Sequence, residues 1–367
     1  MTGRPAHVEY AVLGGGVAGL ALAWRLARLG HPPLVLRSSA PAASLVAAGM
    51  LSPNPEMNLA PAVGRLAAES LREYPRFLTE LGEDTDRDTG YRRSGLLRVA
   101  YSQDEATGLR EEVGRYEAAG MPSRWLSARA CREEEPGLGD AIVGGLLSYD
   151  EAQVQPTWML AALSEALVRR GGRVMEGAVT DVVAGERGGV AVHVEGGWRL
   201  LADRVVVALG SWSGSLPSLP YPVRPVKGQL LVFEGGRGPS RIVYWGHDYL
   251  LTKPDGTVLL GGTMEEAGFD VTPTSRSEEV RRLLPTLWPA LVDVPATTRV
   301  GLRPAAPDSL PVAGWLKELP AAYMFTAHFR NGFLFSPLGS RLAAEEIVEG
   351  REAGLFRGFR PSRAGLA

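Results

Sequence analysis

Apolar positions in the first forty residues alternate between the patterns of a buried strand and a buried helix. Residues 9–13 form an apolar run that stops at three glycines, and residues 17–29 are rich in alanine and leucine on almost every face. Gly30 is placed to end this helix, and residues 33–36 form the next apolar run. A helix that is apolar all round must be covered on several sides, as in a doubly wound sheet. The pattern predicts a β-α-β unit.

Helical and extended patterns keep alternating through the rest of the chain. Helices are predicted over residues 62–81, 103–119, 156–170, 275–287 and 338–349. Strands are predicted over residues 94–101, several times between 173 and 209, over 230–233, and over 249–262 with a hairpin turn at 254–256. The alternation does not fit a simple cut into two halves. We therefore predict that segments of one domain enclose insertions that build a second.

The bulk composition narrows the class of protein. The 367 residues carry a net charge of −2, so there is no basic field of the kind that nucleic acid binding requires. Five histidines and one cysteine cannot supply the usual spacings of a structural zinc site, and no metal is expected. No segment has the length of a membrane span or a signal core, which suggests a cytoplasmic protein. Cys131 is expected to be structural.

The glycines at the end of the first strand form a recognisable motif. Gly14, Gly16 and Gly19 have the spacing Gly-x-Gly-x-x-Gly between a strand and a helix, which places a pyrophosphate at the helix N-terminus. This motif predicts dinucleotide binding. An acidic residue should end the second strand and bind the ribose hydroxyls, but Arg37 stands there, followed by Ser38. Either Arg37 is a solvent-facing substitute and Ser38 contacts the ribose, or Arg37 stacks on the adenine or binds a phosphate.

Two arginines near the C-terminus indicate an anionic ligand. Arg303 and Arg330 each stand near a glycine in an otherwise apolar stretch, with no acidic neighbour in the sequence. A guanidinium held in a dry setting needs an anion, and a ligand carboxylate or phosphate can supply it. The segment is therefore a candidate binding site for a small anionic or zwitterionic substrate.

Several segments together resemble a known family over nearly the whole chain. They are residues 14–19, 47–51, 207–212, 225–229, 262–265, 301–304 with Asp308, and 328–332. In these pieces the chain resembles FAD-dependent amino-acid oxidases of the D-amino-acid oxidase superfamily, most closely the glycine oxidases of thiamine biosynthesis. The last two segments are the specific ones, because the glycine motif is shared by many nucleotide-binding proteins.

The resemblance implies an α/β fold, in which an FAD-binding Rossmann-like domain is interleaved with a substrate domain on a mostly antiparallel sheet with helices. The FAD-binding segments would be 1–60, 150–216 and 295–350, and the substrate-binding segments 61–149 and 217–294. Residues 351–367 would form a loosely held surface tail. A homo-oligomer, a tetramer in the relatives, is also implied.

Bound FAD is implied to be noncovalent, because Cys131 does not match the cysteine through which related sarcosine oxidases bind flavin. Arg37 and Leu45 depart from the family pattern, which has Glu and Ser at these positions. The matching flavin contacts are Gly14, Gly16, Val17, Ala18, Gly19, Arg37, Ser38, Ala43, Ser44, Ala48, Gly49, Met50, Val179, Gly210, His328, Phe329, Arg330, Asn331, Gly332, Phe333 and Leu334.

The substrate contacts follow from the same resemblance. Arg303 matches the residue that clamps the substrate carboxylate, and a guanidinium fork suits that role because it forms two parallel hydrogen bonds. Tyr249 matches a second carboxylate contact, although a packed core tyrosine would give the same pattern. His247 is expected to line the pocket, and Arg330 to serve substrate and flavin together.

Two further residues have less defined expectations. Lys227 either supports flavin reoxidation or is a surface or structural lysine. Asp308 is expected to orient the loop after Arg303.

The implied reaction is hydride transfer from the substrate Cα to flavin N5, which gives an imino acid, and O2 then accepts the electrons and becomes H2O2. No obligatory acid or base is assigned, since an apolar pocket favours the neutral amine. Glycine is the first candidate substrate. The alternatives are a D-amino-acid, sarcosine or proline-type oxidase, a dehydrogenase, or a flavoprotein subunit without catalysis.

Overall fold

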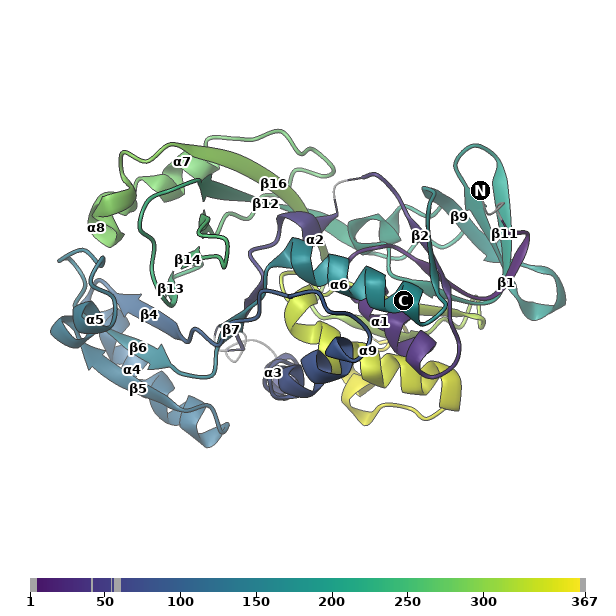
Figure 1. Cartoon of the computed structure of the whole chain (residues 1–367), viewed down its shortest axis with the longest axis horizontal. Helices are drawn as coiled ribbons and strands as arrows, with labels where there is room; N and C mark the ends of the chain where they lie inside the picture. The colour runs from purple at the N-terminus through teal and green to yellow at the C-terminus, as the bar shows by residue number, and fades with distance from the viewer. Residues whose placement is uncertain (1–4, 41, 54, 56–60, 364–367) are drawn as a thin grey trace.

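Two eight-stranded sheets form the frame of the molecule. The computed structural model describes residues 5–40, 42–53, 55 and 61–363. In Figure 1 the first sheet lies to the right and the second to the left, with helices below and between them. No helix in these ranges is both long enough and apolar enough to cross a membrane.

The first sheet has a parallel core. Its strands, in spatial order, are β17 (Val312–Trp315), β18 (Ala322–Thr326), β11 (Trp198–Val207), β1 (His7–Leu13), β2 (Leu34–Arg37) and β8 (Arg173–Glu176). Strand β10 (Val190–Val194) also pairs with β11, and β9 (Val179–Ala184) pairs with β10. Strands β18, β11, β1, β2 and β8 run parallel, and the last three residues of β1, 11–13, are fully buried. Parallel strands that are covered on both faces have nearly continuous apolar sequences, and the runs at residues 9–13 and 33–36 follow this rule.

Helix α1 (Val17–Arg28) is the centre of the helical layer. It connects β1 to β2, as predicted, and packs against α6 (Pro156–Arg169) and α9 (Gly332–Glu349). Helix α3 (Pro61–Gly82) packs in turn against α9 (Figure 1). Ten of the twelve residues of α1 are buried, which explains why its sequence is apolar on almost every face.

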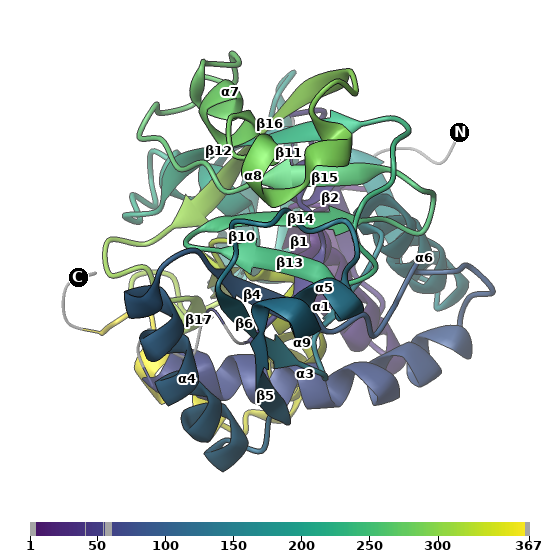
Figure 2. The same ribbon diagram turned by 90° about the vertical axis from the view of Figure 1, so that its left-hand side faces the viewer.

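The second sheet is mostly antiparallel. Its strands, in spatial order, are β16 (Ala296–Ala305), β12 (Arg224–Phe233), β15 (Val258–Gly261), β14 (Asp248–Thr252), β13 (Ile242–Trp245), β4 (Leu96–Ala100), β6 (Gly144–Ser148) and β5 (Ser123–Ser127). Figure 2 looks toward this sheet, with β16 and β12 near the top and β5 at the bottom. Strands β12 and β16 pair over ten residues each. Only β13 and β4 pair in parallel among these neighbours.

The remaining elements are short or lie at the edges. They are α2 (Ala43–Val46), α4 (Gln103–Ala118), α5 (Ala128–Glu134), α7 (Arg276–Arg281), α8 (Leu284–Leu287), the strand pair β3 (Met50–Leu51) and β7 (Ala152–Gln153), and the 3-10 helices η2 (Glu186–Gly188), η3 (Gly210–Gly214), η4 (Pro289–Leu291) and η5 (Gly354–Phe359). The single helix predicted over 275–287 is wrong, because it is divided into α7 and α8.

The last long helix begins earlier than predicted. Helix α9 starts at Gly332 rather than Leu338 and contains Pro337. Proline has no N–H to give to the carbonyl of Phe333, four residues back. That carbonyl instead accepts the Tyr74 hydroxyl at 2.6 Å and the Ser336 hydroxyl at 2.9 Å. Tertiary contacts therefore compensate for the missing bond.

The prediction of a loosely held tail is wrong for residues 351–363. Phe356 and Phe359 of η5 are 2% and 0% exposed and belong to the core around α1. Arg360 forms an ion pair with Glu346 at 2.6 Å. The segment is rich in arginine, which suggested an exposed tail, but its buried phenylalanines hold it against the core. Residues 364–367 lie outside the described ranges.

The predicted domain boundaries stay a prediction. Two elements nevertheless pack across them. Helix α3, placed in the substrate-binding segment, packs against α9, and β16, placed in the FAD-binding segment, pairs with β12 in the second sheet.

Candidate functional site

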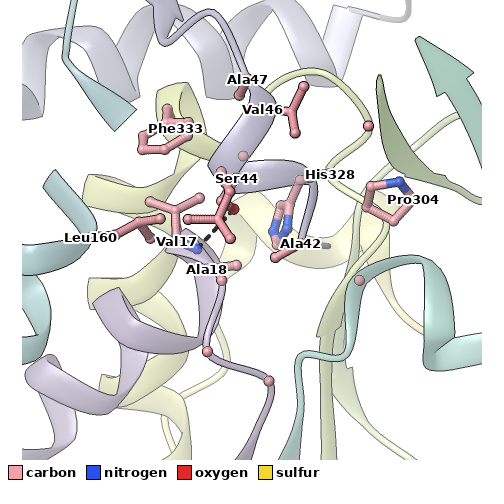
Figure 3. A pocket seen from close by; sticks show the side chains of 18 of the residues that line it. Val17, Ala18, Ala42, Ser44, Val46, Ala47, Leu160, Pro304, His328 and Phe333 are labelled. Carbon is pink, nitrogen blue, oxygen red and sulfur yellow. Dashed lines mark hydrogen bonds between the residues drawn. The ribbon is translucent and has the colours of Figure 1, made fainter. Parts of the chain in front are cut away.

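A cavity of about 1160 Å³ runs between the two sheets. Its lining comes from the glycine turn after β1, from α2, from α6, and from β14, β16 and the loop before α9. Figure 3 shows part of it, where Val17, Ser44, His328 and Phe333 approach one another. The cavity therefore joins segments that are far apart in the sequence.

The glycine turn is closely packed, which explains two of its three glycines. Gly14 has a φ of +115°, and a Cβ there would stand 2.2 Å from the carbonyl oxygen of Ala208. A Cβ on Gly19 would stand 2.0 Å from the carbonyl oxygen of Gly14. Larger residues would separate β1, α1 and the end of β11, so the glycines hold the start of the helix against the sheet.

The N-terminus of α1 opens into this cavity. Its N-cap residue, Gly16, has no side chain to accept the first N–H groups, and the N–H of Val17 donates to Ser44 Oγ at 3.0 Å. The dashed line in Figure 3 marks this bond. The cavity, the glycine turn and the N-terminus of this helix together fit the pyrophosphate of a dinucleotide.

The loop before α9 carries backbone strain. Ala327 and Phe329 have φ values of 58° and 50°, which non-glycine residues rarely adopt. His328 lies between them, 6% exposed, with its ring edge-to-face against Phe325 at 4.7 Å. Strained residues are often found at ligand sites, where the surrounding structure holds them. Sequence gave no signal of this strain.

The neutral state of His328 should make the protein sensitive to acid. Burial lowers the pKa of His328 from 6.5 to about 4, so the folded protein binds this proton less readily than the unfolded chain. The contribution of His328 to the free energy of unfolding is fully present above about pH 6.5 and is lost as the pH falls toward 4. We expect this group to remove about 3 kcal/mol of unfolding free energy between pH 7 and 4. Urea denaturation of wild type and of His328→Phe should show that difference, whereas equal pH dependence in both would contradict it.

Arg303 lies in the cavity wall on β16. Its Nη1 donates to the carbonyl oxygen of Thr263 at 2.9 Å, and its guanidinium lies over Gly228, where a Cβ would stand 2.0 Å from Nη1. Burial lowers the pKa of Arg303, although Tyr249 opposes the shift. The side chain therefore presents a cation in a confined space that only a glycine on β12 leaves open.

The other predicted substrate residues line the same cavity. Tyr249 interacts with Arg303, and burial raises the pKa of Tyr249 to about 12, which keeps its hydroxyl protonated. His247 is exposed in the turn before β14, and Arg330 lies close enough to Arg303 to lower its pKa further. The structure thus brings all four residues together.

A buried lysine next to the cavity wall was missed by sequence reasoning. Lys253 is 1% exposed, and its Nζ donates to the carbonyl oxygens of Ala48 and Val154 and, at 3.0 Å, to Gln153 Oε1. Burial lowers the pKa of Lys253 to about 7. The residue ties the small-residue stretch before β3 to the second sheet. The sequence pattern predicts a hairpin turn at residues 254–256, directly after Lys253, and assigns no role to the lysine.

Most of the predicted flavin contacts line the cavity. Gly19 and Leu334 are the exceptions. Gly19 packs against the backbone of Gly14, and Leu334 lies in the hydrophobic core. Leu45, the second departure from the family pattern, is half exposed and also lines the cavity. The individual contacts with the cofactor stay predictions.

Three residues lie away from the cavity lining. Lys227 Nζ is buried against Asp270 at 3.2 Å, which favours the structural alternative. Asp308 accepts the N–H of Leu310 in the loop after β16 and also pairs with Arg363 of the tail. Cys131 is buried, and burial raises the pKa of its thiol to about 11, as suits a structural cysteine.

Comparisons with known proteins agree with this geometry. The family model of FAD dependent oxidoreductases matches residues 9–346. The chain is 30% identical to the glycine oxidase of Pseudomonas aeruginosa over 93% of this chain and 94% of that one. The crystal structure of glycine oxidase from Geobacillus kaustophilus has a TM-score of 0.89 at 27% identity, with 98% of this chain and 99% of that chain covered.

A longer relative has a second part. The chain is 31% identical to the bifunctional protein ThiO/ThiG of Nostoc sp., over 97% of this chain but 55% of the relative. The chain therefore spans about half the length of the bifunctional relatives that it matches.

These findings confirm the predicted resemblance, the fold class, the use of FAD and the oxidoreductase class related to amino-acid oxidases. Among the described residues, no group of histidine, cysteine and acidic side chains could hold a metal ion. The glycine turn, the N-terminus of α1 and the volume of the cavity fit FAD. The chain belongs to the family of FAD dependent oxidoreductases.

Proposed function

We propose that this protein oxidises glycine, or a similarly small amino acid, to the imino acid while O2 is reduced to H2O2. Hydrolysis of the imino acid then gives glyoxylate and ammonia. The observation that carries the proposal is the Arg303 guanidinium, which lies over Gly228 in the wall of the FAD cavity beside Tyr249. A cation in a confined space, next to a neutral hydroxyl, is suited to a single carboxylate.

The protein contributes orientation and desolvation. Arg303 and Tyr249 would fix the carboxylate, and the position of the carboxylate would fix the Cα next to it. Ala48, Leu230 and Tyr244 line the cavity and belong to one hydrophobic cluster, so they would limit access of water to a bound substrate. A dry site favours the neutral amine over the ammonium ion, so the amine can enter oxidation without an assigned general base. When bound, FAD supplies the acceptor for two electrons from the Cα–H bond.

The relatives support this substrate class. The glycine oxidase relatives match over nearly their whole length, and the ThiO/ThiG relatives suggest a role in thiamine thiazole synthesis. The alternative substrates suggested by the sequence are sarcosine, D-amino acids and proline. The alternative functions are a dehydrogenase and a noncatalytic flavoprotein subunit. A cytoplasmic homo-oligomer remains part of the proposal.

A peroxide assay across four amines tests the substrate. Glycine and sarcosine should yield H2O2 and, without oxygen, should bleach the yellow flavin spectrum, because both present one carboxylate and a small Cα. D-alanine and D-proline are the matched comparisons. Turnover of only the bulkier D-amino acids would refute the choice of glycine, and bleaching without peroxide would indicate a dehydrogenase.

A further inference from the structure

The end of β2 lacks the acidic residue that usually binds the adenosine ribose in a dinucleotide site. Arg37 is the last residue of β2 and lines the FAD cavity. Its aliphatic stem lies over the glycine turn, since a Cβ on Gly15 would stand 2.8 Å from Arg37 Cβ and 3.0 Å from Cδ. The stem therefore occupies the surface beside the turn, and its cationic end extends beyond it.

A carboxylate stands beside this position on the neighbouring strand. Glu176 is the last residue of β8, which pairs in parallel with β2, and its register partner is Arg37. Glu176 Oε1 lies 3.8 Å from Arg37 Nη2. The N–H of Gly177 also donates to the Arg37 carbonyl at 2.9 Å, which fixes the two strand ends to each other. Both side chains line the cavity.

We propose that Glu176 replaces the missing acid and accepts hydrogen bonds from the adenosine ribose hydroxyls of FAD, while Arg37 positions it. This inference goes beyond the proposed function, because it concerns the cofactor and holds for any substrate. A carboxylate can only accept, and ribose hydroxyls can donate, so the chemistry matches. The parallel pairing places Glu176 at the same edge of the sheet, one strand away from the usual position.

Other acidic residues near this end of the cavity are less suited. Glu165 accepts hydrogen bonds from Thr85 and Arg87 and pairs with Arg169. Glu195 follows β10 and also lines the cavity, and its N–H donates at 2.8 Å to the carbonyl of Ala178, two residues after Glu176, so Glu195 is the competing candidate. Glu186 of η2 is exposed and lies outside the cavity lining, so it serves as the matched control.

The test is a thermodynamic cycle, in which the affinities of two proteins for two cofactors are compared. Flavin-free wild type and Glu176→Gln are titrated with FAD and with an FAD analogue whose adenosine ribose is 2′,3′-dideoxy, and binding is followed by flavin fluorescence. Glu176→Gln should weaken FAD binding about tenfold, as the loss of a hydrogen bond to a charged group predicts. The analogue should bind wild type about as weakly, and Glu176→Gln should not weaken it further.

Three additional variants sharpen the result. The control Glu186→Gln should bind FAD like wild type. The exchanged pair Arg37→Glu with Glu176→Arg should keep most of the affinity, because it returns the acid to the end of β2. The proposal would be overturned if Glu176→Gln weakened binding of the dideoxy analogue as much as it weakens binding of FAD. Unchanged FAD affinity in Glu176→Gln would also overturn it. A loss that appears in Glu195→Gln instead would assign the contact to that residue.

Discussion

Replacing Arg303 with alanine should lower kcat/KM for glycine by about a hundredfold or more, equivalent to about 3 kcal/mol of transition-state binding. The guanidinium is the cation that the cavity presents beside Tyr249, and its removal leaves the substrate carboxylate without its bidentate partner. The measurement is the initial rate of peroxide formation over a range of glycine concentrations. The flavin spectrum should remain that of wild type, since Arg303 is expected to bind substrate.

Arg303→Lys is the matched variant, because it keeps the charge but loses the planar fork. It should recover only part of the lost activity. Near-normal kinetics in Arg303→Ala would remove Arg303 from the site. Loss of bound flavin in both variants would instead assign the residue to the cofactor.

Gly228→Ala should impair the same clamp without touching a charged group. The added Cβ would stand 2.0 Å from Arg303 Nη1 and 2.4 Å from Cζ, so the guanidinium must move away. A displaced clamp misplaces the Cα, and a shift of about 1 Å can cost about a hundredfold in rate. We expect kcat/KM for glycine to fall by about tenfold to a hundredfold. The thermal midpoint should change little, because the atoms that yield belong to the end of a flexible side chain.

Gly108→Ala is the control for this substitution. Nothing lies within 4 Å of a Cβ at that position on α4, so the variant should keep normal kinetics. If Gly228→Ala also retains normal kinetics, the position of the guanidinium does not control the reaction. A large fall in thermal midpoint would show damage to the sheet rather than to the clamp.

The parts of the fold that follow from local pattern were predictable. The β-α-β unit depends on two apolar runs and three glycines close in the sequence, and β1, α1 and β2 follow that pattern. Arg303 and Arg330 stand out for a similar reason, because cations in apolar stretches are conspicuous. The structure brings both to one cavity.

The remaining features depend on contacts between distant segments. Tyr74 compensates for Pro337 from a helix more than two hundred residues away, and the start of α9 could not be inferred without it. The burial of Lys253 depends on carbonyls near residues 48 and 154, and the fixed tail depends on where Phe356 finds a core. Likewise, the role of Gly228 is visible only once β12 and β16 are paired.

The long pairing of β12 with β16 has a mechanical consequence. Arg303 stands near the end of a ten-residue strand that is paired along its length, and the Ser211 hydroxyl of η3 donates to the neighbouring carbonyl of Leu302 at 2.9 Å. The backbone that carries the guanidinium is thus braced by the second sheet and by the segment that follows β11 of the first. Stiffness of this kind preserves the angle between substrate and flavin during thermal motion, so precision at the reacting carbon comes from a rigid frame.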